Sequence, residues 1–163
     1  LGGEMQAAMD RLQGMVENWE KFPLQPIMMI FWQNTRVLLL AMLLGAFSFG
    51  VLGVLPIMAT MGLMGLIMAV MGQSGIPPEQ FLFAFILPHG LVEIPAAILA
   101  TAATLRAGAI LAAPDQHQTI GQVWISSLAE WAKVMVGLVL PLLLIAAALE
   151  AWVTPRLALY LLK

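Results

Sequence analysis

Residues 37–78 read VLLLAMLLGAFSFGVLGVLPIMATMGLMGLIMAVMGQSGIPP and contain no Asp, Glu, Lys or Arg. If helical, a run of this length extends about 63 Å, enough for two crossings of a hydrocarbon core about 30 Å thick. The composition of the whole chain also indicates a membrane protein. Of all residues, 61% are hydrophobic and only 10% are charged, against about 25% charged in soluble proteins. We therefore expect an all-α, polytopic helical membrane protein embedded in a lipid bilayer.

Composition also excludes several classes of partner and site. The net charge is −2 and no cluster of Lys or Arg is present, so nothing is available to neutralise the phosphates of a nucleic acid. Because the chain has no cysteine, it has no disulfide, no thiolate metal site and no cysteine nucleophile. Its serines form no recognisable nucleophile arrangement with a histidine. We expect no enzymatic activity and no cofactor.

Proline and glycine divide the charge-free run into two helices. Pro56 favours a turn between a first membrane-spanning helix at about 37–55 and a second at about 57–71. Small residues recur along both helices, and they allow a neighbouring helix to approach closely. The glycines that we expect to serve this packing are Gly45, Gly50, Gly62 and Gly65.

The next apolar stretch, at about 80–112, is too long for one upright crossing. Pro88 and Pro95 disturb helical hydrogen bonding, and Gly90 lets another backbone come close. Two arrangements fit. In one, a single long helix is kinked near the two prolines. In the other, a short half-helix breaks at residues 88–90 and the chain continues as a second half, a pattern that includes re-entrant segments.

The same stretch carries the candidate functional centre, His89 and Glu93, within the sequence FILPHGLVEIPAA at residues 85–97. In a helix, four-residue spacing places the imidazole and the carboxylate on one face. A charge at membrane depth costs about 2.5 kcal/mol or more, so such residues face a partner or a cavity. The pair is either a buried hydrogen bond that fixes helix packing or part of a polar or proton path. We expect no metal site, because the chain has only two histidines.

The N-terminal residues 1–26 are expected to form an amphipathic interfacial helix and a linker, before a transmembrane domain at 27–163. That domain opens with an aromatic and polar group in which Asn34 would cap a helix and Arg36 would anchor it at the interface. Arg36 is also a possible counter-ion of Glu93. Arg106 marks the exit of the central helix from the hydrocarbon.

The C-terminal part begins with residues 113–133, which we expect to contain an interfacial helix. A last spanning helix at about 134–152 follows, bracketed by Trp131 and Trp152 as an aromatic belt. Four crossings would place both termini on one side. By the positive-inside rule that side is the cytoplasm, because it would hold five basic residues against two on the other: Arg11, Lys21, Arg36, Arg156 and Lys163 against Arg106 and Lys133.

Three segments of the chain resemble the stage II sporulation protein M (SpoIIM) family. They are the aromatic-x-Asn-x-Arg group at Trp32–Arg36, the string LPHGLVEIPA at residues 87–96 and the segment EAWVTP at residues 150–155. The resemblance runs from about residue 27 to 155, and Gln33 stands where the family often has a second Asn. It implies a prokaryotic cell membrane and, in spore-formers, a scaffold that places peptidoglycan-remodelling proteins at the engulfing septum. Some relatives sit near ATPase or transporter genes, and no enzymatic activity is implied.

Two functions follow as expectations. The first is a non-enzymatic membrane subunit or scaffold that oligomerises or recruits other membrane proteins. The alternative is a permease-like transport component, with or without coupling to an ATPase, in which His89 and Glu93 line a polar or proton path.

Overall fold

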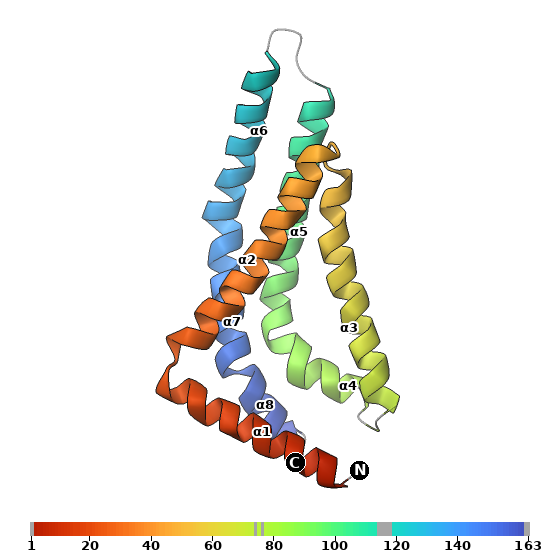
Figure 1. Cartoon of the computed structure of the whole chain (residues 1–163), viewed down its shortest axis with the longest axis vertical. Coiled ribbons are helices and arrows are strands. Elements are labelled where there is room, and N and C mark those ends of the chain that lie inside the picture. The colour runs from red at the N-terminus through yellow and green to blue at the C-terminus, as the bar shows by residue number, and fades with distance from the viewer. Residues whose placement is uncertain (1, 74, 76, 114–118, 162–163) are drawn as a thin grey trace.

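The computed structural model describes residues 2–73, 75, 77–113 and 119–161, and these contain helices and turns but no strand. Four helical segments are long and apolar enough to cross a membrane: Leu24–Phe47, Val51–Gln73, Pro78–Ala112 and Ile120–Tyr160. The expected all-α polytopic fold is thereby confirmed. Both ends of the chain lie at the same, lower end of the bundle (Figure 1).

Three long segments form the core of the bundle. They are α2 (Leu24–Phe47), α5 (Leu87–Ala112) and a C-terminal helix that comprises α6 (Ile120–Val134), η3 (Met135–Val139) and α7 (Leu140–Trp152). Alanines on α5 allow the three to approach closely around larger apolar side chains. The main buried cluster consists of Leu38, Met42, Ala96, Ala100, Ala107, Trp131, Met135, Val139 and Leu143.

The first spanning helix, α2, begins thirteen residues earlier than the expected 37 and ends eight residues before 55. Pro26 lies in its first turn, where a missing N–H is tolerated. The chain reverses at residues 48–50, and not at Pro56 as expected. Phe49 (φ 53°) and Gly50 (φ 93°) have left-handed backbone conformations there, and the Ser48 hydroxyl donates to the Leu44 carbonyl at 2.6 Å.

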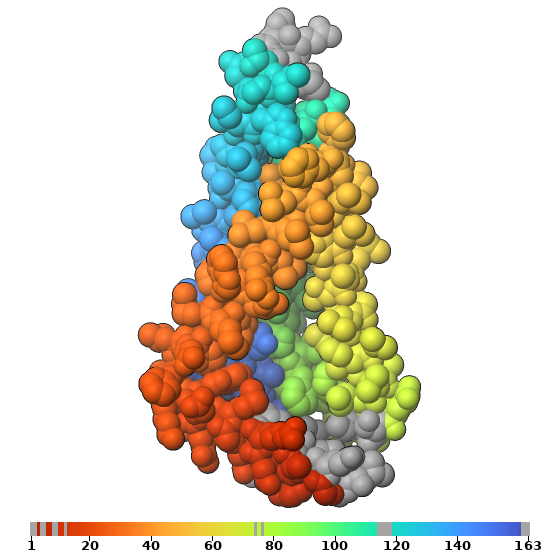
Figure 2. All heavy atoms as spheres, viewed as in Figure 1, coloured from red at the N-terminus to blue at the C-terminus, as the bar shows by residue number. Residues whose placement is uncertain are grey.

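After the turn, η1 (Val51–Val54) leads into α3 (Leu55–Gln73), which extends two residues beyond the expected 57–71 at each end. Helix α3 stands at the side of the bundle (Figure 1) and has no buried residue. Figure 2 shows α5 recessed between α2 and α3 on this face.

The central segment adopts features of both expected arrangements. A short helical stretch, α4 (Pro78–Phe81) and η2 (Leu82–Ile86), runs across the lower end of the bundle, and α5 then turns upward along its length (Figure 1). The change of direction precedes Pro88, and α5 continues through Pro95. Helix α5 therefore traverses the bundle once and does not re-enter.

The last spanning helix is longer than the expected 134–152. Helix α6 is not a separate interfacial helix, because η3 joins it directly to α7 as one straight element (Figure 1). Gly137 and Pro141 lie at this junction, but the helix continues through both. Trp131 is buried in the core, where its indole Nε1 donates to Thr104 Oγ1 at 3.1 Å. It therefore does not belong to an aromatic belt.

Two helices close the lower end. Helix α1 (Gly2–Lys21) lies across that end and packs beside α8 (Thr154–Leu161) (Figure 1). Arg156 Nη2 donates to Glu20 Oε1 at 2.7 Å and so joins the two. The side chains of Met5, Met9 and Leu12, on which the expected apolar face of α1 partly rests, lie outside the described residues, as does Lys163.

Both π-helical stretches, η2 and η3, immediately precede a proline near the start of an α-helix. Pro88 follows η2 by two residues, and Pro141 follows η3 by two residues. A proline cannot donate to the carbonyl four residues earlier, and its ring crowds that turn. A wider π turn accommodates the ring without ending the helix.

Candidate titratable cluster beside a cavity

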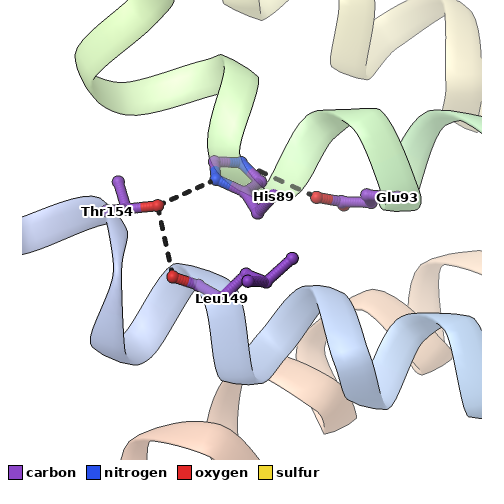
Figure 3. Close-up of polar contacts among 4 residues, drawn as sticks. All are labelled: His89, Glu93, Leu149 and Thr154. Atoms are coloured by element: carbon purple, nitrogen blue, oxygen red, sulfur yellow. Dashed lines mark hydrogen bonds and ion pairs between the residues drawn. The ribbon is translucent and has the colours of Figure 1, made fainter. Parts of the chain in front are cut away.

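His89 and Glu93 lie near the lower end of α5, one turn apart on the same face. His89 Nε2 is 3.8 Å from Glu93 Oε2 (Figure 3), and their side chains are 11% and 26% exposed. The pair that the sequence predicts is therefore formed, but the separation is too long for a hydrogen bond.

The other nitrogen of His89 faces the C-terminal helices. His89 Nδ1 lies 3.3 Å from Thr154 Oγ1, which in turn donates to the Leu149 carbonyl at 3.5 Å (Figure 3). Because the Thr154 hydrogen is directed to that carbonyl, the hydroxyl oxygen can accept from an Nδ1–H. This network favours the tautomer with its proton on Nδ1 and a free lone pair on Nε2, toward Glu93.

A third titratable group joins the pair from a different helix. Glu150, on α7, places a carboxylate oxygen in a group with the ligand atoms of His89 and Glu93, all within 4.8 Å of one another. Sequence reasoning did not connect Glu150, near the end of the last spanning helix, with Glu93. Glu150 could have been identified by the same sequence feature as Glu93, which is an acidic side chain inside an apolar helix.

A cavity of about 140 Å³ borders the cluster between α2, α3 and α5. Its walls are mostly apolar, and its polar lining comes from Asn34, Thr60, His89 and Glu93. The Asn34 amide nitrogen Nδ2 is buried and makes no hydrogen bond with any described residue. An unsatisfied buried donor is costly. The cavity thus has polar groups on each of its three walls: Asn34 on α2, Thr60 on α3, and His89 with Glu93 on α5.

The basic residues considered as counter-ions lie elsewhere. Arg36 is half-way along α2, and its guanidinium donates to the Gln33 side-chain oxygen on the exposed surface instead of pairing with Glu93. Asn34 lines the cavity and does not cap α2, which begins at Leu24. Arg106 lies thirteen residues from Glu93 on α5, about 20 Å along the helix. Among the described residues, neither Arg36 nor Arg106 is a counter-ion of Glu93.

Two of the four glycines expected to serve helix packing do so. A Cβ added at Gly45 would lie 2.3 Å from Thr104 Cγ2, and one at Gly50 would lie 3.0 Å from the Leu105 Cα. A Cβ at Gly62 or Gly65, on α3, would meet nothing within 4 Å. Helix α3 therefore carries small residues that no described part of this chain contacts.

Gly90 also differs from expectation. A Cβ there would contact only the side chains of Ile86, at 3.4 Å, and Ile94, at 3.8 Å. No described backbone atom of another helix lies within 4 Å of that position.

The cluster is able to bind a cation or exchange protons, since it combines one imidazole and two carboxylates beside a cavity. The hydroxyl of Thr154 lies within hydrogen-bond distance of His89 and donates its hydrogen to the Leu149 carbonyl.

Comparison with known proteins gives one finding. The family model described as Stage II sporulation protein M matches residues 3–155. No curated protein and no solved structure matches the chain significantly.

Proposed function

This chain belongs to the stage II sporulation protein M (SpoIIM) family, and from that premise we propose that it is a non-enzymatic membrane subunit. In this proposal it acts as a scaffold that self-associates or recruits another membrane protein through α3. The observation that carries the proposal is that α3, although long enough to span a membrane, has no buried residue.

Helix packing in membranes depends on van der Waals contact between closely approaching backbones, because lipid tails are as apolar as leucine. Within the core this chain uses glycine in that way: Gly45 and Gly53 both pack against Thr104 Cγ2. Gly62 and Gly65 present equally small surfaces on α3, where nothing fills them. A helix from a second molecule would fill them, and this is the reason for assigning association to α3.

A photo-crosslinking experiment tests this proposal directly. A photoreactive phenylalanine analogue is placed at Gly65 and, as the matched control, at Gly137, which is exposed on η3 and also meets nothing within 4 Å. We expect irradiation of native membranes to give one adduct of defined mass from position 65 and none from position 137. A dimer-sized adduct identifies self-association, and a different mass identifies a partner.

Substitution of the same glycines provides the second measurement. Gly65→Leu should abolish the association seen by native mass measurement in mild detergent, since the added side chain keeps a second helix away. Gly137→Leu should leave it intact. Equal behaviour of the two variants, or absence of any adduct at position 65, would contradict a role for α3.

We infer that the protein resides in the cell membrane of a prokaryote with both termini in the cytoplasm. The family is the one described as Stage II sporulation protein M, and the resemblance to it implies a prokaryotic cell membrane. Helices α1 and α8, which carry Arg11, Lys21 and Arg156, lie at the end of the bundle that holds both termini (Figure 1). Positive charge is retained on the cytoplasmic side. Protease protection of tags at either end in sealed vesicles tests the orientation.

A second candidate function, a permease-like component with or without coupling to an ATPase, is favoured by one specific observation. His89 and Glu93 line a cavity between spanning helices, where ionisable residues often mark a substrate or proton path. Proton flux into liposomes should fall at least about tenfold in Glu93→Gln. Glu130→Gln, which alters an exposed carboxylate on α6, should leave the flux unchanged. Flux that is equal in both variants would remove this candidate.

A further inference from the structure

We propose that His89, Glu93 and Glu150 form a binding site for a divalent first-row transition-metal ion such as Zn²⁺ or Mn²⁺. This inference concerns ion binding alone, and it holds whether or not α3 associates with a partner. Three ligand-type atoms within 4.8 Å of one another, contributed by α5 and α7, are its starting point.

The histidine is oriented as a metal ligand requires. Its Nδ1 is held by Thr154, which is itself held by the Leu149 carbonyl (Figure 3). Ligating histidines usually donate their second ring N–H to such a partner, which fixes the tautomer and the ring plane. The lone pair on Nε2 is then free, and it faces Glu93.

Distances within the cluster suit a shared ion better than a direct bond. Nitrogen and oxygen ligands bind Zn²⁺ at about 2.0–2.2 Å, so two ligands at tetrahedral or octahedral angles lie about 2.8–3.6 Å apart. The separation of 3.8 Å between His89 Nε2 and Glu93 Oε2 is close to this range. The widest separation, up to 4.8 Å, closes by a small rotation of a glutamate side chain.

Charge gives an independent reason for a cation. No described Lys or Arg forms an ion pair with Glu93 or Glu150: the ion pairs of Lys133 and Arg156 are with Glu130 and Glu20. Two carboxylates in mostly apolar surroundings are strongly unfavourable without compensation. A divalent ion would neutralise both at once.

The cavity provides a second observation that indicates a ligand. Asn34 lines the same cavity as His89 and Glu93, and its buried amide nitrogen Nδ2 has no hydrogen-bond partner among the described residues. The amide nitrogen and oxygen differ only by a flip about the terminal bond, so Asn34 offers either an oxygen to a cation or a donor to a water molecule bound to it. The three protein ligands would thus leave coordination positions open toward the cavity.

The donor set selects the class of ion. One imidazole and two carboxylates suit Zn²⁺, Mn²⁺ or Fe²⁺, whereas Mg²⁺ prefers oxygen alone and Cu⁺ prefers sulfur. The absence of cysteine from the sequence excludes a thiolate-bound ion. A bound ion would also join α5 to α7 near the lower end of the bundle.

Equilibrium binding to the purified full chain tests the site. The affinity tag is removed, the protein is stripped with EDTA, and Zn²⁺ or Mn²⁺ is added in excess Mg²⁺; bound metal is then counted by elemental mass spectrometry after gel filtration. We expect about one ion per chain. Glu93→Gln and Glu150→Gln, which keep side-chain size, should each weaken binding more than tenfold, and Glu130→Gln on α6 should not change it.

A fourth variant separates a true site from general attraction of cations to acidic groups. Thr154→Val keeps all three ligands but removes the partner of His89 Nδ1, so it should weaken binding about 10–100-fold. The visible spectrum of the Co²⁺ complex, if it reports mixed nitrogen and oxygen ligands, provides a readout that does not depend on any variant's stability. Less than stoichiometric metal in the wild-type chain, or equal affinity in Glu150→Gln, would overturn the proposal.

Discussion

The contact between Gly108 and the reversal at residues 48–50 gives the sharpest test of the packing. An added Cβ at Gly108 would lie 2.2 Å from the Gly50 backbone nitrogen and from the Phe49 carbonyl carbon. Both are backbone atoms, so no side-chain rotation relieves the overlap. Gly108→Ala therefore forces α5 away from the turn between α2 and α3.

The size of the effect follows from the geometry. Ordinary van der Waals contact begins near 3.4 Å, so the two elements must separate by about 1.2 Å, the difference between 3.4 and 2.2 Å. Overpacking of a core commonly lowers stability by about 1–3 kcal/mol. A clash with backbone atoms should cost an amount at the upper end of this range, because no side chain can move to relieve it. By the scaling for domains of this length, about 3 kcal/mol lowers the melting temperature by about 6–12 °C.

Thermal unfolding in detergent, followed by circular dichroism at 222 nm, measures this effect. The matched control is Gly62→Ala on α3, where a Cβ meets nothing within 4 Å. Alanine is favoured over glycine inside a helix by about 0.5–1 kcal/mol, so the control should be as stable as the wild type or slightly more so. A melting temperature for Gly108→Ala within about 2 °C of the wild type would refute the close approach of α5 and the turn.

Three further substitutions test individual interactions by the same measurement. Trp131→Phe removes the indole donor to Thr104 and should destabilise by about 1 kcal/mol; no change would show that this hydrogen bond contributes nothing. Thr119→Ala removes the capping box at the start of α6 and should cost about 1 kcal/mol, which an unchanged melting temperature would contradict. Glu20→Gln breaks an exposed ion pair with Arg156 and should cost less than about 1 kcal/mol, so a loss of several degrees would show that α1 holds α8 more strongly than one surface pair allows.

The number of spanning helices could be predicted from the sequence because hydropathy and charge-free length act locally. The ends of these helices could not be predicted in the same way, because they depend on single residues. The reversal depends on the left-handed backbone of Phe49 and Gly50, whereas Pro56, the stronger turn signal, fits without strain into the first turn of α3. Residues 120–134 carry enough polar side chains to resemble an interfacial helix, yet nothing between them and α7 ends the helix.

The candidate site could be predicted only in part, for a related reason. His89 and Glu93 are four residues apart, so the helix alone brings them together. Glu150 is fifty-seven residues beyond Glu93, and only the packing of α7 against α5 places it there. Arg36 is the opposite case, a residue that the sequence suggests for the site but the fold keeps away from it. Its charge suggests pairing with Glu93, but the orientation of α2 directs the Arg36 side chain to the surface.

The π turn η3 determines how far α7 is rotated about the helix axis relative to α6. An α-helix turns about 100° per residue, so removing one residue from Met135–Val139, and thereby converting the wide turn to a regular one, would rotate α7 by about that angle relative to α6. Trp131, above the turn, would keep its place, while Glu150, below it, would swing out of reach of His89. The extra residue in this turn thus changes the rotation of the lower half of the helix about its axis. The lower half can therefore face α5 without any change in how the upper half packs.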